Sequence, residues 1–200
     1  MSTLPPPGEY WKPPPSKEKG DDSEIGILLG VGGALSQWEI IENHFAWLFA
    51  IFVESKTHAA RRAYGAVQSN SGRRHLLRNA SEVFFTMRGV ADEMRDQFGA
   101  LLAHFERAAT RRNEIAHGLC MGFQFDDERF GHFLVPADYN SMKTSAFLTD
   151  ATQEDRFAVL RMNYRYTSAD IADFSNRFGE LNKAVVEYGA ALVKTHPQRQ

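Results

Sequence analysis

The amino-acid sequence predicts a mainly α-helical protein, a bundle of roughly four to five helices with a small β-strand insertion before the last helix. Over most of the chain, apolar residues recur at spacings of three and four, as they do on the buried face of a helix. Residues 119–166 instead contain short alternating or bulky segments separated by turn residues, which is typical of strands. A hydrophobic content of 43% and a charged content of 24% are those of an ordinary globular domain.

The first 21 residues differ in composition from the rest. Prolines occupy positions 5–7 and 13–15 among charged and small residues. Such a segment buries little apolar surface, and its prolines favour extended conformations. We therefore expect residues 1–21 to be a disordered leader that folding does not need, and residues 22–196 to form one helical domain.

The first predicted helix starts near residues 22–23 and runs to about residue 54. Its second half is apolar nearly all round, so it should lie at the centre of the bundle or face a second subunit. By length it also resembles a membrane span, but polar residues at its centre oppose that interpretation: Gln37, Glu39, Glu42, Asn43 and His44. A buried or dimer-facing helix is the better explanation.

Later helices are expected over residues 57–68, then from a turn at 69–72 through Met87, and then from Asp92 to His117. Gly118 is expected to end the last of these in a left-handed conformation. Two or three short strands should follow within residues 119–166. Residues 167–170 have the character of a capping box and should start the final helix.

Charge and cysteine content limit the classes of function. A net charge of -2 argues against a protein that coats nucleic acid by bulk attraction, although a small basic site remains compatible with it. The single cysteine, Cys120, cannot form an intrachain disulfide, which favours a cytoplasmic protein. No signal peptide is evident, and no spacing of histidines or cysteines suggests a metal site or a cofactor.

The segment from Arg111 to Gly118 has the highest concentration of reactive side chains. Arg112 is permanently charged, whereas His117 can exchange a proton near neutral pH. Asn113 and His117 share a helix face, while Arg112 falls on the apolar stripe and needs a partner or a wet cleft. These groups suit contact with a phosphodiester and proton transfer. Position and spacing alone favour a plainer interpretation, in which the cations cap the end of a helix.

The motif itself resembles the signature of the HEPN superfamily: Arg112 followed by Asn113, three further residues, His117 and a glycine. The resemblance covers residues 24–118 and, loosely, 167–195. It implies a small helical bundle, in many members a metal-independent endoribonuclease of toxin, antiphage or RNA-processing systems. It also implies an active cleft at a two-fold dimer interface. There Arg112 would contact the scissile phosphate, His117 would transfer protons, and Asn113 would position the RNA or the histidine.

This chain departs from the family pattern because Arg111 offers a second arginine, and the sequence does not say which one faces the cleft. Some members of the superfamily also bind RNA or nucleotides without cutting them. We therefore expect a homodimeric, metal-independent endoribonuclease that acts by 2'-hydroxyl attack. A non-catalytic HEPN-like RNA- or nucleotide-binding module, or a helical protein-interaction module, is the alternative. RNA and an antitoxin or other partner protein are the expected partners, without a membrane.

Two further groups of charged residues have both a functional and a structural interpretation. Glu42 lies on the apolar stripe of the first helix and either orients Arg112 or Arg111 or belongs to a buried structural ion pair. Basic residues of the middle helices either line an RNA path or form solvated helix faces: Arg61, Arg62, Arg73, Arg74, His75 and Arg78.

Overall fold

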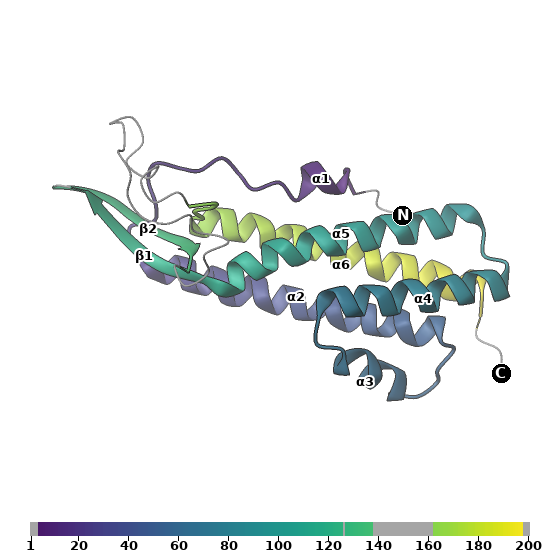
Figure 1. The fold of residues 1–200 in the computed structure, drawn as a ribbon. Helices are drawn as coiled ribbons and strands as arrows, with labels where there is room; N and C mark the ends of the chain where they lie inside the picture. Colours follow the sequence, from purple (N-terminus) through teal and green to yellow (C-terminus); the bar gives the residue numbers. More distant parts are fainter. Residues whose placement is uncertain (1–3, 126, 138–161, 198–200) are drawn as a thin grey trace. The chain divides into compact units, whose positions relative to one another are not determined.

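The computed structural model describes residues 4–125, 127–137 and 162–197 of the chain. Helices and strands follow one another in the order α1 (Pro7–Tyr10), α2 (Glu24–Phe52), α3 (Ala59–Ala66), α4 (Asn70–Arg88), α5 (Asp92–His117), β1 (Gly118–Phe125), β2 (Glu128–Pro136) and α6 (Ser168–Thr195) (Figure 1). The prediction of a mainly helical protein with a small sheet before the last helix is confirmed. Residues 138–161, where part of the insertion was expected, lie outside the described residues.

The chain forms two compact units. The first comprises Met1–Lys12, Gln37–Thr110 and Arg177–Gln200, and the second comprises Pro13–Ser36 and Arg111–Asn176. Helices α2, α5 and α6 each contribute residues to both units. The sequence predicts instead a leader followed by one domain.

Aromatic rings form the core of the first unit. The ring of Phe52 on α2 lies 4.8 Å from that of Phe98 on α5 and also contacts Phe84 and Phe85 on α4. Phe98 in turn stacks on Tyr188 of α6, with ring centroids 5.6 Å apart. Edge-to-face and offset contacts of this kind add to the free energy gained by burying the rings. They explain why the second half of α2 is apolar nearly all round.

Helix α2 is long and apolar enough to cross a membrane by length and composition alone. The core helix of a water-soluble protein passes the same test. Within the first unit, Trp38 and Phe45 of α2 are buried against Phe105 of α5.

Side-chain caps fix where two of the helices begin. Ser69 Oγ accepts a hydrogen bond from the backbone N–H of Gly72 at 3.0 Å, so residues 69–72 are the N-cap and first turn of α4. At α6, the N–H of Thr167 donates to Asp170 Oδ2 at 2.9 Å, and the N–H of Asp170 donates to Thr167 Oγ1 at 3.4 Å. The capping box that the sequence predicts is therefore confirmed.

In the second unit, β1 and β2 form an antiparallel hairpin that begins with the pair Gly118 and Pro136. The prediction that Gly118 is a left-handed helix stop is wrong, because the described glycines with positive φ are Gly89 and Gly131. Glycine is needed at position 118 for a different reason: a Cβ there would lie 2.7 Å from Cγ of Leu134. Strand β1 thus starts directly after His117, without an intervening loop.

The N-terminal segment differs from the disordered leader that the sequence predicts. Residues 7–10 form α1, and Trp11 is 2% exposed. Its indole N–H donates to Nδ1 of His104 at 3.0 Å, and its ring stacks on Phe178. Burial lowers the pKa of His104, which keeps Nδ1 free to accept this hydrogen bond.

Residues 13–21 are held by polar contacts within the second unit. Lys17 Nζ lies 2.8 Å from Asp170 Oδ1. The backbone of Asp21 exchanges hydrogen bonds with that of His132, and its carboxylate accepts hydrogen bonds from the backbone N–H and the hydroxyl of Ser168. One tryptophan and a few hydrogen bonds therefore order a segment whose overall composition is that of a flexible chain.

We expect Trp11→Ala to lower the free energy of unfolding by about 3 to 5 kcal/mol, since it removes a buried indole and leaves His104 without its donor. The matched control is Lys12→Ala, which changes the exposed neighbouring residue and should have little effect. Urea unfolding followed by circular dichroism measures both. Equal stability of Trp11→Ala and the unaltered protein would show that the N-terminal segment does not pack in solution.

Candidate functional site

The motif singled out in the sequence occupies the last turns of α5 within the second unit. His117 is the final residue of α5 and is exposed to solvent, whereas Arg111, Arg112 and Asn113 are partly buried. The expectation that the motif ends a helix is confirmed.

Arg111 belongs to a partly buried triangle formed by one ion pair and two hydrogen bonds. Its Nη1 lies 2.9 Å from Glu114 Oε2 and donates to the hydroxyl of Tyr166 at 3.0 Å. The same hydroxyl donates to Glu114 Oε2 at 2.6 Å. Burial raises the pKa of Tyr166, and the charge of Glu114 raises it further, so the phenol stays protonated as the donor. With the side chains of Arg111 and Glu114 only 12% and 13% exposed, this ion pair is structural.

Arg112 has a different environment although it follows Arg111 directly. Its Nη1 donates to Asn113 Oδ1 at 3.2 Å, and no carboxylate within the described part of the chain pairs with it. Its Nε is buried without a hydrogen-bond partner there, as is that of Arg111. A partly desolvated cation without a counter-ion is costly, and a bound anion would relieve that cost.

The neighbouring groups add what the chemistry of a phosphodiester needs. With its oxygen engaged by Arg112, the amide of Asn113 keeps its N–H₂ group as a donor. Asn113 and His117 are four residues apart on one helix and therefore lie on the same face. A cation and an amide donor in contact with each other can bind a phosphate oxygen, and an exposed imidazole can exchange a proton.

Glu42 belongs to the first unit, and its observed partners are not Arg111 or Arg112, the arginines that the sequence suggested. It is 5% exposed and accepts a hydrogen bond from the hydroxyl of Tyr64 at 2.9 Å. Its Oε1 lies 2.9 Å from Arg73 Nη1, a contact of ionic rather than hydrogen-bonding geometry. The alternative of a buried structural ion pair therefore describes Glu42.

Two of the basic residues of the middle helices have carboxylate partners within the fold. Arg73 pairs with Glu42, and Arg74 pairs with Glu106. For these two arginines the ion pairs agree with the structural interpretation, and the RNA path that was the other interpretation stays a prediction.

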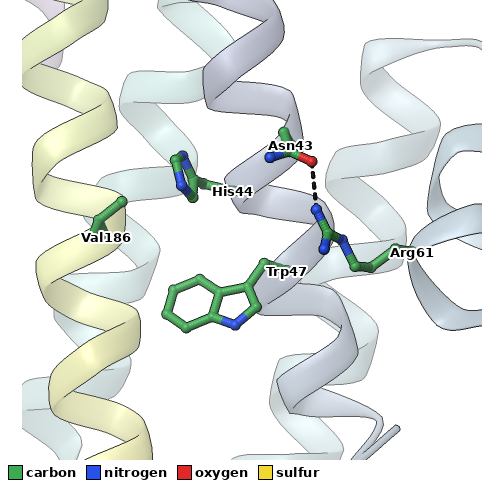
Figure 2. A pocket seen from close by; sticks show the side chains of 5 residues that line it. All are labelled: Asn43, His44, Trp47, Arg61 and Val186. Carbon is green, nitrogen blue, oxygen red and sulfur yellow. Dashed lines mark hydrogen bonds between the residues drawn. The ribbon is translucent and has the colours of Figure 1, made fainter. Parts of the chain in front are cut away.

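A pocket that the sequence did not reveal lies in the first unit (Figure 2). Its volume is about 340 Å³, and it is lined by Asn43, His44, Trp47, Arg61 and Val186. The first three residues lie on α2, which the sequence predicts to be a buried or dimer-facing helix. Arg61 lies on α3 and Val186 on α6. Only the fold brings these side chains together, so no spacing in the sequence could have identified them.

Among the described residues, no group of three or more histidine, cysteine, aspartate or glutamate side chains is placed to hold a metal ion. No protein-family model, no curated protein and no solved structure matches this chain.

Removing the charge of Arg111 should cost much more stability than removing the charge of Arg112. Arg111→Met removes the cation that pairs with the largely buried carboxylate of Glu114, and we expect a loss of about 3 kcal/mol in the free energy of unfolding. Arg112→Met removes a cation that has no paired carboxylate among the described residues, and should change that energy by less than about 0.5 kcal/mol. Urea unfolding of both variants measures the difference. If Arg112→Met were as costly as Arg111→Met, Arg112 would have a structural ion-pairing role instead.

Proposed function

We propose that this protein is a HEPN-type, metal-independent endoribonuclease in which Arg112 binds the scissile phosphate and His117 transfers protons. The observation that carries the proposal is the contrast between the two arginines. Arg111 is neutralised by Glu114, whereas Arg112 is partly buried, has no carboxylate partner among the described residues, and lies five positions before an exposed histidine.

The reaction uses the substrate's own nucleophile. One His117 takes the proton of the ribose 2'-hydroxyl, and the 2'-oxygen forms a bond to phosphorus. The bond from phosphorus to the 5'-oxygen breaks, and the leaving oxygen receives a proton from the partner's His117. Arg112 stabilises the negative charge that develops on the phosphate oxygens, and the amide of Asn113 supplies a second donor. The products are a 2',3'-cyclic phosphate and a free 5'-hydroxyl.

A homodimer with a shared cleft is part of this proposal, and the first turns of α2 support it. Ile25, Leu28 and Leu29 are 64%, 53% and 71% exposed, at helical spacings that place them on one side of α2. A Cβ added at Gly32 or Gly33 would meet no atom within 4 Å, so that side of the helix remains open. An exposed apolar patch of this kind is typical of an interaction surface.

The apolar patch lies in the same unit as the motif and close to it. Burial raises the pKa of Cys120, and the charges of Glu24 and Asp21 raise it further. The start of α2 therefore lies near Cys120 of β1, three residues after His117 (Figure 1). A second copy docked on this patch would bring two motifs toward one interface.

The cleavage assay should give activity in the presence of EDTA, with 2',3'-cyclic phosphate ends and no cleavage of DNA or 2'-O-methyl RNA. His117→Ala and Arg112→Ala should each lower the rate by about 100-fold or more, because each removes a group that acts on the reacting phosphate. His58→Ala and Arg62→Ala, which alter exposed residues of the first unit, should keep full activity. Were His117→Ala fully active but less stable by about 1 kcal/mol, capping would be its role and the ribonuclease proposal would fail.

The same assay tests the shared cleft. Leu29→Glu should convert the dimer to a monomer in light scattering and abolish cleavage, because it places a charge in the apolar patch. Val83→Glu is the matched control, because Val83 is also an exposed apolar residue, on α4, with 59% of its surface accessible. A fully active Leu29→Glu monomer would exclude a cleft built from two subunits.

A further inference from the structure

We propose that the pocket lined by Asn43, His44, Trp47, Arg61 and Val186 binds a nucleotide, with its base stacked on Trp47 and its phosphate on Arg61. All five residues belong to the first unit, so this proposal stands independently of the ribonuclease motif. The volume of about 340 Å³ lies within the range of sites for small molecules.

Trp47 provides a flat and rigid platform. It is partly exposed, whereas Trp11 and Trp38 are buried at 2% and 1% exposure. A Cβ at Gly189 on α6 would overlap the six-membered ring of Trp47, so glycine allows the indole to lie directly against the backbone of α6. An aromatic ring held in this way offers a face on which any base can stack.

Arg61 supplies a cation with N–H donors that have no partner among the described residues. One of its terminal nitrogens donates to Asn43 Oδ1, as the dashed line in Figure 2 shows. No carboxylate in the described ranges of the chain pairs with Arg61. Because guanidinium carries five N–H donors, several remain for a phosphate group, and the N–H₂ group of Asn43 can add another.

His44 adds a polar group opposite Arg61. Its Nδ1 lies 2.7 Å from Asn182 Oδ1, an acceptor, so Nδ1 carries the hydrogen and Nε2 of the neutral ring is an acceptor. Val186 gives the pocket an apolar wall on α6 (Figure 2). A ring platform, an acceptor and one cation match a base joined to a phosphate, whereas an acid without a ring would leave the indole unused.

The test is a titration of the full-length protein with AMP, followed by tryptophan fluorescence and by calorimetry. We expect saturable quenching, because Trp47 is the partly exposed one of the three tryptophans and stacking quenches its emission. Arg61→Gln should weaken binding at least tenfold, and Trp47→Leu should abolish it in calorimetry. Arg62→Gln, which alters the exposed neighbour of Arg61 on α3, is the matched control and should bind normally.

Adenosine tests the role of the phosphate and should bind much more weakly than AMP. A trinucleotide of RNA shows the source of the nucleotide. If it binds more tightly than AMP and still depends on Trp47 and Arg61, the ligand is an RNA strand. If it binds as tightly as AMP, the ligand is a free nucleotide.

His117→Ala should bind AMP normally, so failure of the ribonuclease proposal leaves this result intact. The nucleotide proposal is overturned if AMP gives no saturable response at millimolar concentration, or if Trp47→Leu or Arg61→Gln, folded as judged by circular dichroism, binds as tightly as the unaltered protein.

Discussion

The carboxylate of Glu114 is the constraint on which the second unit depends. It pairs with Arg111 and accepts a hydrogen bond from Tyr166, while its backbone carbonyl accepts one from the hydroxyl of Tyr164. Tyr166 also exchanges two backbone hydrogen bonds with Leu134 of β2. One acidic side chain thus connects the end of α5, the residues before α6 and the hairpin. Glu114 pairs with Arg111, whereas Arg112 has no carboxylate partner among the described residues, and we propose that an external anion pairs with it.

The first unit uses its carboxylates in the same way. Glu42 forms an ion pair with Arg73 and accepts a hydrogen bond from the hydroxyl of Tyr64, and Glu106 forms an ion pair with Arg74. Arg61, which is partly buried, receives an amide oxygen rather than a carboxylate. In each unit, therefore, a partly buried arginine donates to an asparagine, which leaves its positive charge intact. The proposed sites at Arg112 and Arg61 both depend on this arrangement, and both would favour a ligand that bears a phosphate group.

The sequence predicted the elements that depend on local patterns. The periodicities of α2, α5 and α6 and the capping box at Thr167 follow from residues within a few turns of one another. The errors concern contacts between distant residues. Burial of Trp11 depends on His104, 93 positions away, and the need for glycine at 118 depends on Leu134 across the hairpin. The ion pair of Arg111 with Glu114 is local, but the Tyr166 hydroxyl that contacts both of them lies 55 positions after Arg111, so the sequence could not say which of the two consecutive arginines would be paired.

We propose that Arg112, and not Arg111, contacts the phosphate of a bound RNA. The most direct measurement is the ¹H–¹⁵N resonance of each arginine Nε–H during titration with a 2'-O-methyl RNA, which binds without being cut. Lysine substitutions at the two positions assign the signals. We expect a large, saturable shift of the Arg112 signal and little change in the Arg111 signal, because Arg111 stays paired with Glu114. A shift at Arg111 alone, or at neither arginine while RNA binds, would contradict it.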